Sequence, residues 1–233
     1  MKEILMILPS RGRPLKVEDT LVSWQETSTG RSELFLCLDH DDPTWKDYDK
    51  SLFGEKAHGL PVVSYRIGPR LRVCPTVNKV VEEYPDYKYY GFLGDDHVFR
   101  TKGWEDLAIN KIEENGGWGI VYGDDKFQGE KLATAAIMSA NIPKTLGYMA
   151  IPGLTHLYMD NFWMEIGRGI NRLFYIPEIV IEHMHFEAGK SPKDPQYAEV
   201  NSSEMYSHDG AIFGKWIDVQ KAEDVRKLQQ AMQ

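Results

Sequence analysis

Runs of apolar residues alternate along the chain with segments in which apolar positions recur every three or four residues. The runs predict buried strands, and the periodic segments predict helices with one apolar face. Predicted strands lie at 4–8, 33–38, 62–67, 90–97, 118–122, 132–139, 173–177 and 179–186. Predicted helices lie at 15–26, within 46–61, at 76–83 and 103–114, from 141, from 160 and over 219–232. Thr76, Thr101 and Asp160 are expected to cap three of these helices. This alternation predicts an α/β fold with a mainly parallel central sheet flanked by helices.

Acidic side chains stand where several predicted strands end. Asp39 comes directly after the second strand, Asp95 and Asp96 interrupt the strand at 90–97 just before His97, and two more aspartates follow at 124–125. In α/β proteins ligands bind beyond the carboxyl ends of the strands, and carboxylate oxygens with an imidazole nitrogen suit Mg²⁺ or Mn²⁺. An aspartate pair can also simply form a turn, which is the interpretation we favour for 124–125.

Two histidines and one aspartate in the second half of the chain could complete such a site. His183 and His185 alternate with apolar residues, so a strand over 179–186 would carry both on one face. A lone strand histidine is usually a hydrogen-bonded polar residue, but a pair at this spacing favours a metal or phosphate role. A helix cap explains Asp160, while a carboxylate there facing the metal strand could also act as a general base.

Basic residues lie in three segments that could receive an anion. They are Arg11 and Arg13 in the loop after the first strand, Arg70, Arg72 and Lys79 before the acidic strand, and Lys190 in a loop at 189–195 that could close over a ligand. The spacing of a P-loop is absent from the first of these segments. Each group is also compatible with an ordinary solvated surface.

Composition narrows the classes of protein. The chain has 233 residues, of which 42% are hydrophobic and 27% charged, as in an ordinary globular protein. With 27 basic against 35 acidic residues the formal charge is −8, which disfavours binding of nucleic acid through a general basic surface. Cys37 and Cys74 are expected to be reduced thiols. The absence of a signal peptide pattern and of a membrane span predicts a cytoplasmic protein.

Taken together, these motifs resemble the GT-A class of nucleotide-sugar-dependent glycosyltransferases over roughly residues 4–186. The segment that includes Pro9, Arg11 and Arg13 resembles the loop that lies against the nucleotide in that class. Asp39 matches the carboxylate that commonly contacts the base. The stretch 68–78 resembles the segment leading into a helix with an asparagine, here Asn78, ahead of the acidic motif.

The resemblance also implies a metal site and a base. Gly94-Asp95-Asp96-His97 occupies the place of the Asp-x-Asp motif, which binds the ribose and the divalent metal. A strict motif is absent, because His97 stands two positions after Asp95. Either His97 replaces the second aspartate or Asp96 is the ligand, and we favour Asp96. Asp160 falls at the place of a catalytic base, and His183 and His185 fall where a late histidine completes the metal site.

The implied function is metal-dependent transfer of a sugar from a nucleoside diphosphate sugar to an acceptor hydroxyl, with inversion of the anomeric centre favoured over retention. Mn²⁺ or Mg²⁺ would be the cofactor and a UDP-sugar the favoured donor, with Arg70, Lys79 or Lys190 near the diphosphate. The acceptor could be a glycan, a protein, a small molecule or a modified DNA base. The catalytic domain is expected over 1–186, with a mobile loop and helical segment at 187–233 packed on it. A sugar nucleotidylyltransferase and a non-catalytic nucleotide- or carbohydrate-binding module are the alternatives.

Overall fold

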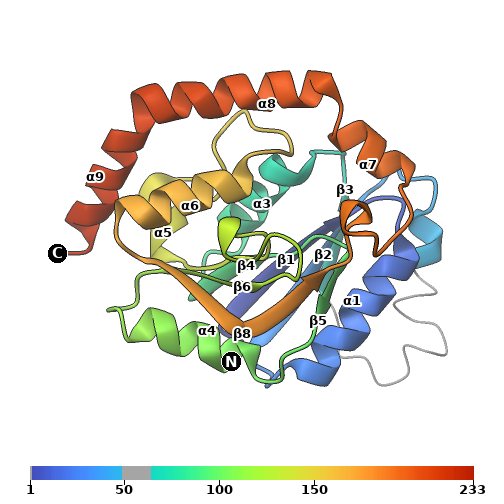
Figure 1. Ribbon diagram of the computed structural model, residues 1–233, viewed down its shortest axis with the longest axis horizontal. Helices are drawn as coiled ribbons and strands as arrows, with labels where there is room; N and C mark the ends of the chain where they lie inside the picture. The colour runs from blue at the N-terminus through green and yellow to red at the C-terminus, as the bar shows by residue number, and fades with distance from the viewer. Residues whose placement is uncertain (1, 49–63) are drawn as a thin grey trace.

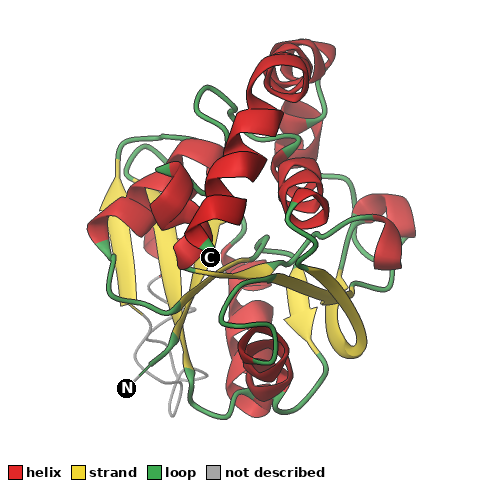
Figure 2. Ribbon diagram, turned by 90° about the vertical axis from the view of Figure 1, so that its left-hand side faces the viewer, coloured by secondary structure: helices red, strands yellow, loops and turns green. Residues whose placement is uncertain are grey.

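The computed structural model describes residues 2–48 and 64–233, and within these ranges it shows one twisted sheet between two layers of helices (Figures 1 and 2). The sheet order is β3-β2-β1-β4-β7-β6-β8-β5. Its strands are β1 (Ile4–Ser10), β2 (Ser32–Asp39), β3 (Ser64–Gly68), β4 (Tyr89–Phe92), β5 (His97–Phe99), β6 (Ile120–Asp124), β7 (Ile137–Ser139) and β8 (Leu173–His183).

Most strand pairs are parallel, so the predicted fold class is confirmed. β1 pairs in parallel with β2 and β4, β2 with β3, and β6 with β8. The antiparallel strand β7 joins β4 to β6, and β5 runs antiparallel to β8 at the edge. Because β1, β2, β3 and β4 are parallel, their carboxyl ends meet at one edge of the sheet, where the predicted polar residues follow them.

The alternation of β1 side chains divides the core between the two faces of the sheet. Ile4 and Met6 face a cluster that contains the apolar faces of α1 (Pro14–Thr27) and α4 (Trp104–Glu113). Leu5 faces the other cluster. That cluster includes residues of α3 (Val73–Glu83), α5 (Asn141–Leu146), α6 (Met159–Gly169), the π-helical turn Trp216–Gln220 and α9 (Lys221–Ala231). Both faces of the sheet are therefore covered, as the continuous apolar runs predict.

Two further α-helices belong to the last part of the chain. They are α7 (Pro195–Val200) and α8 (Ser203–Lys215), and Figure 1 shows α8 and α9 along one edge of the molecule. Trp216, just before α9, and Leu228, within α9, are buried in the core cluster around α6. Among the described residues no helix is long and apolar enough to cross a membrane.

Three predicted helix caps are wrong. Thr76 lies inside α3, where its hydroxyl donates to the Arg72 carbonyl. Thr101 precedes α4 by three positions and instead donates to the Glu178 carbonyl, which ties it to β8. Asp160 is in the first turn of α6 and makes no cap hydrogen bond there. The sequence rule placed a polar residue at each helix start, whereas the Thr76 hydroxyl bonds a carbonyl four residues earlier and the Thr101 hydroxyl makes a tertiary contact.

Several strand boundaries also differ from the predictions. The two strands predicted at 173–177 and 179–186 form the single strand β8, and the strand predicted at 132–139 shortens to β7. The helix predicted within 46–61 and the first residues of the strand predicted at 62–67 fall largely outside the described residues; β3 is the described part of that strand.

Candidate functional site

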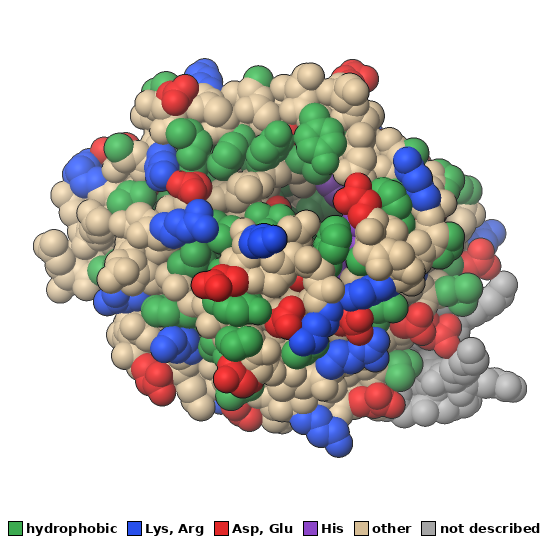
Figure 3. All heavy atoms as spheres, in the orientation of Figure 1, with side chains coloured by type: hydrophobic (Ala, Val, Ile, Leu, Met, Phe, Trp, Pro, Cys, Tyr) green, Lys and Arg blue, Asp and Glu red, His purple; other side chains and the backbone are tan. Residues whose placement is uncertain are grey.

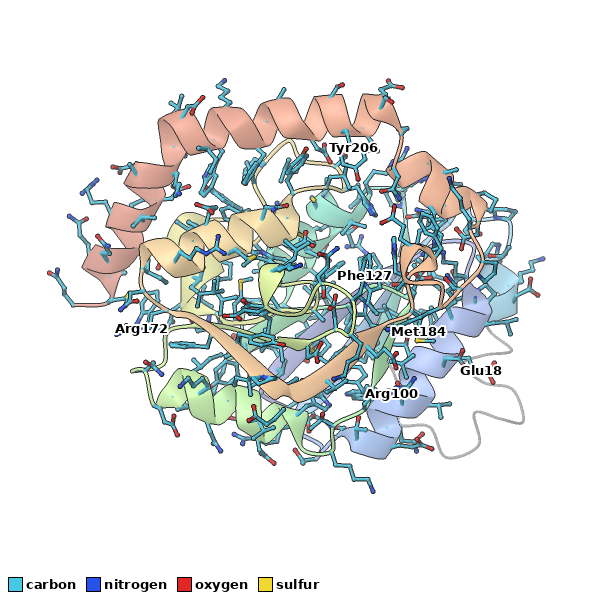
Figure 4. The ribbon with its side chains drawn as sticks, viewed as in Figure 1. Glu18, Arg100, Phe127, Arg172, Met184 and Tyr206 are labelled. Carbon is cyan, nitrogen blue, oxygen red and sulfur yellow. The ribbon has the colours of Figure 1, made fainter. Side chains whose placement is uncertain are left out.

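A cavity of about 380 Å³ opens at the carboxyl ends of β1, β2 and β4. Figure 3 shows histidine side chains deep in a hollow on this face of the molecule. Phe127, from the loop after β6, and Tyr206, from α8, line the cavity from different elements (Figure 4). Segments that are distant in the sequence thus converge on one site.

Asp96, His97 and His183 form a compact cluster on the cavity wall. One ligand atom from each lies within 4.8 Å of the others. The antiparallel register of β5 and β8 sets His97 opposite His183, and their rings stack with centroids 4.4 Å apart. Gly94 makes the preceding turn possible, because a Cβ there would meet Asp96 Oδ1 and His97 Nδ1 at 2.9 Å. The Met184 amide donates to the Asp96 carbonyl at 2.8 Å and fixes the two strands together.

This cluster fits a divalent cation. Within the described residues, His97 Nε2 and His183 Nδ1 are buried side-chain atoms without a hydrogen-bond partner. One carboxylate and two imidazoles are a donor set that suits Mn²⁺. An unpaired buried nitrogen is costly in a protein interior, and coordination of a metal through His97 Nε2 would satisfy that atom. His183 turns its Nε2 toward Asp96 Oδ1, at 3.3 Å, and its Nδ1 toward Asp125 Oδ2, at 3.8 Å. We therefore regard Asp96, His97 and His183 as a candidate metal site.

The pKa shifts of the three cluster residues favour binding of a cation. Burial alone would raise the pKa of the Asp96 carboxyl, but His183, His97 and the Tyr197 hydroxyl outweigh it and hold that pKa below its usual range. Burial and the neighbouring His183 charge lower the pKa of His97 to about 4, so its imidazole is neutral. Burial is opposed at His183 by the carboxylates of Asp125 and Asp96, which raise its pKa to about 9. A cation bound to His183 would replace that proton.

Asp95 faces away from the histidines toward the first loop. It accepts hydrogen bonds from Ser10 Oγ at 2.7 Å and from Arg13 Nη1 at 2.9 Å. Ser10 Oγ also lies 2.9 Å from the Tyr48 hydroxyl. Asp95 therefore anchors the loop after β1, and the adjacent Asp96 is the aspartate that belongs to the metal cluster.

The structure brings most of the predicted nucleotide-contacting residues to the cavity, but not all. Pro9, Arg11, Arg13, Asp39, Arg70 and Asp95 line it, whereas Asn78, Lys79 and Lys190 do not. The Asn78 side chain instead bonds the backbone of Met149 and Ala150. Lys79 pairs with Glu83 one helical turn away, and Lys190 pairs with Glu182 at 2.9 Å. These three polar residues are engaged in holding secondary structure together.

His185 lies outside the cluster. β8 ends at His183, so the prediction that one strand carries both histidines is wrong. His185 lines the cavity, but its Nδ1 accepts a hydrogen bond from the Glu187 amide at 3.3 Å and its ring stacks on Phe127 with centroids 5.3 Å apart. The chain turns away from the strand direction before His185 is reached, which a period-two pattern cannot reveal.

Asp160 lines the same cavity from the first turn of α6. Desolvation raises the pKa of its carboxyl to about 6, partly offset by the charge of His183. A carboxylate with a pKa near neutrality is a stronger proton acceptor than an ordinary aspartate. The surroundings of Asp160 thus suit a general base.

Asp125 is a site residue that the sequence did not single out. It forms a turn, as expected, because its Oδ1 accepts from the backbone amides of residues 127, 128 and 129. Its Oδ2 lies 3.8 Å from His183 Nδ1 and accepts from the Thr134 hydroxyl. Asp125 is 2% exposed. It therefore forms a turn and also places a buried negative charge next to His183.

Asp209, on α8, fixes the loop that leads into α6. Its fully buried carboxylate accepts from the Thr155 amide and hydroxyl and from the amides of His156 and Leu157, at 2.7–3.0 Å. His156 and Leu157 line the cavity, and Asp160 follows three residues later. A carboxylate from the end of the chain therefore sets the position of this wall of the cavity, and the sequence carries no local signal of it.

We expect Asp209→Ala to lower the free energy of unfolding by about 3 kcal/mol, because it leaves buried amides without an acceptor. For a chain of this length that corresponds to a melting temperature about 6–12 °C lower, measurable by differential scanning calorimetry. His208→Ala is the matched control, since that imidazole is half exposed and contacts the same carboxylate. It should change stability by no more than about 0.5 kcal/mol. Equal effects of the two substitutions would contradict this role of Asp209.

The sheet order and the helices on both faces define a GT-A-like α/β fold, so the resemblance predicted from the motifs is confirmed at the level of the fold. Mannosyltransferase PcManGT from Pyrobaculum calidifontis, in complex with GDP-Man and Mn²⁺, is similar with a TM-score of 0.58 and 10% identity, covering 98% of this chain and 73% of that one. Glucosyl-3-phosphoglycerate synthase from Mycobacterium tuberculosis, with Mn²⁺, UDP-glucose and phosphoglyceric acid, gives 0.62 and 10%, covering 91% and 80%.

S. aureus TarS (residues 1–349) in complex with UDP-GlcNAc gives a TM-score of 0.58 and 12% identity, covering 98% of this chain and 70% of that one. No family model and no curated protein matches the sequence. At such low identities the likeness establishes the fold. The residues that would act on a substrate have to be argued from this chain's own cavity.

Proposed function

We propose that the chain is a glycosyltransferase that moves a sugar from a nucleoside diphosphate sugar to an acceptor hydroxyl. The observation that supports this most directly is one cavity, at the carboxyl edge of a GT-A-like sheet, that combines three kinds of group. These are the Asp96–His97–His183 cluster, the arginines of the loops after β1 and β3, and the raised-pKa carboxyl of Asp160.

Different residues of the cavity would carry different steps of this reaction. Asp96, His97 and His183 would hold Mn²⁺ or Mg²⁺, which as a Lewis acid stabilises the negative charge of a leaving diphosphate. Arg11, Arg13 and Arg70 supply cationic guanidinium groups that suit phosphate oxygens. Asp39, which pairs with Arg11 and Arg70, would contact the nucleotide base.

Asp160 would accept the proton of the acceptor hydroxyl as that oxygen attacks the anomeric carbon. The bond from the sugar to the diphosphate breaks as the new glycosidic bond forms, so a single attack inverts the anomeric centre. A retaining reaction would not need this base. We propose inversion because Asp160 lines the cavity and its desolvated carboxyl has the pKa of a competent base.

The donor and the metal are open to a direct binding test. We expect one of UDP, GDP, CDP or dTDP to raise the melting temperature in the presence of Mn²⁺, with UDP favoured. A ligand at a hundred times its Kd stabilises the native state by about 2.7 kcal/mol, or about 5–10 °C for this chain length. The same panel with EDTA in place of Mn²⁺ is the control. Slow Mn²⁺-dependent hydrolysis of the matching nucleotide sugar would then separate an enzyme from a binding module.

Failure of all four nucleotides to shift the melting temperature, with and without metal, would contradict the proposal. A shift with no hydrolysis and no transfer to any offered hydroxyl would instead favour a nucleotide-binding module. The hexosyl specificity, the cytoplasmic location and the acceptor are part of the same proposal. They become testable once the donor nucleotide is known.

A further inference from the structure

The segment 190–201, which contains α7 and which we call the strap, lies between β8 and α8 (Figure 1). It contributes several residues to the cavity wall. Gly189 immediately precedes it with φ of +70°, a left-handed conformation that lets the chain turn sharply. Asp194 begins α7 by accepting a hydrogen bond from the Tyr197 amide at 3.0 Å. The strap is thus a short structured element between two turns.

Two carboxylates of the strap bind arginines that face the cavity. Asp194 accepts from both Nε and Nη2 of Arg13, at 2.9 and 2.8 Å, in the two-point geometry with which arginine also binds phosphate. Glu199 accepts from Arg70 Nη2 at 2.9 and 2.8 Å and from Arg72 Nη1. The strap therefore places one negative charge on the loop after β1 and another on the loop after β3.

A third contact reaches the metal cluster. The Tyr197 hydroxyl donates to Asp96 Oδ2 at 2.5 Å, and the Arg13 guanidinium lies over the Tyr197 ring, 4.1 Å from its centroid. Tyr197 is 3% exposed, so the ring fills the space between Arg13 and the cluster. The strap touches the cavity at the three places where a metal-bound diphosphate would need free partners.

The cations of the cavity are consequently neutralised in this arrangement. Each of its five arginines lies within 4 Å of at least one carboxylate. The pairs are Arg11 with Asp39 and Asp41, Arg13 with Asp95, Asp96 and Asp194, Arg66 with Glu83, Arg70 with Asp39 and Glu199, and Arg72 with Glu199. For Arg13, Arg70 and Arg72 a partner comes from the strap. A diphosphate entering here would have to replace those carboxylates.

We propose that the strap is an internal competitor of the donor: Asp194 and Glu199 occupy two anion subsites, one at Arg13 and one at Arg70 and Arg72, that take the diphosphate when the strap withdraws. This inference rests on the proposed function for the identity of the natural ligand, a nucleoside diphosphate. The strap-bound form binds no diphosphate at these arginines, so the apparent affinity equals the intrinsic affinity multiplied by the fraction of molecules in which the strap is displaced.

The test is the double substitution Asp194→Asn with Glu199→Gln in the full chain, with inorganic pyrophosphate as the probe. Both changes keep the size of the side chain and remove its charge, and asparagine still caps a helix, so α7 retains its start. We expect calorimetry to show pyrophosphate binding at least about tenfold tighter than in the unsubstituted chain. We also expect faster tryptic cleavage after Lys190, the first strap residue, because the strap is released more often and neither substitution is next to that bond.

A matched control removes two charges elsewhere. The control variant is Glu3→Gln with Asp106→Asn. In the unsubstituted chain Glu3 and Asp106 pair with Arg31, at 2.7 and 2.8 Å, and Glu3 also pairs with Lys88. None of these residues lines the cavity. The net charge of the chain changes by the same amount as in the strap variant. Pyrophosphate affinity and cleavage after Lys190 should therefore stay at the unsubstituted level, which separates a local release from a general gain of positive charge.

Equal or weaker pyrophosphate binding by the strap variant would overturn the proposal, and so would the absence of measurable binding to either chain. The glycosyltransferase proposal fails separately. Tighter pyrophosphate binding with no turnover of any nucleotide sugar would leave the strap inference standing and remove the transferase. Turnover by the unsubstituted chain, with pyrophosphate affinity unchanged in the variant, would do the opposite.

Discussion

Replacing Asp160 with asparagine is expected to lower the rate of sugar transfer about a thousandfold, while the affinity for the donor nucleotide stays within about twofold. Asparagine has nearly the same shape but cannot accept the proton of the acceptor hydroxyl. Asp160 lines the cavity and is not part of the metal cluster, so donor binding should survive. The measurement is kcat for transfer, together with a separate binding isotherm for the nucleoside diphosphate.

The pH dependence supplies a second readout of the same residue. Desolvation raises the pKa of Asp160 to about 6, and the base form is the deprotonated carboxylate. Transfer by the unsubstituted chain should therefore fall as the pH drops through about 6 and be level above it. Asp160→Asn should lose this acid limb along with the rate.

Glu165→Gln is the matched control for Asp160→Asn. Glu165 lies on the same helix, α6, but its carboxylate pairs with Lys221 and Arg168 outside the residues that line the cavity. It should transfer sugar at the unsubstituted rate. Unchanged turnover in Asp160→Asn would exclude the base role and favour a retaining reaction, which needs no such group.

The strands were predictable from the sequence because their environment leaves a simple signature. β1, β2 and the start of the acidic strand are buried on both faces and read as unbroken apolar runs. The order of strands in the sheet, and the antiparallel placement of β7 and β5, are set by long-range pairing that no local pattern encodes. The class of fold followed from the alternation of elements, whereas its exact topology required the structure.

The metal cluster was predictable because its residues lie at or near the ends of strands. Asp96 lies in the turn after β4, His97 begins β5 and His183 ends β8, so the rule that ligands bind beyond carboxyl strand ends led to them. Asp209 and Tyr197 reach the site from helices of the last part of the chain, and nothing in their neighbours marks them. Lys79 shows the opposite case: the sequence suggested a contact with the diphosphate, but the side chain does not line the cavity and pairs with Glu83 on the same helix.

Replacing His183 with alanine is expected to weaken Mn²⁺ binding more than about a hundredfold and to reduce transfer to background. Loss even of the outer partners of metal ligands typically costs 10–100-fold in affinity, and His183 would be a ligand itself. The substitution also removes the ring that stacks on His97 and that lies 3.3 Å from Asp96 Oδ1. Calorimetric titration with Mn²⁺ in the absence of nucleotide measures the site without relying on turnover.

His185→Ala is the informative comparison, because the sequence placed both histidines at the metal. The two rings have centroids 4.9 Å apart, but only His183 belongs to the compact cluster with Asp96 and His97. His185 is stacked on Phe127 and is not among the three clustered ligands, so its removal should leave Mn²⁺ affinity within about threefold. Asp96→Asn should behave like His183→Ala, since it takes away the anionic ligand and leaves two imidazoles. Equal losses in His185→Ala and His183→Ala would show that the metal sits nearer the strap than the Asp96–His97–His183 cluster. Retained Mn²⁺ affinity in both His183→Ala and Asp96→Asn would remove the cluster as the metal site altogether.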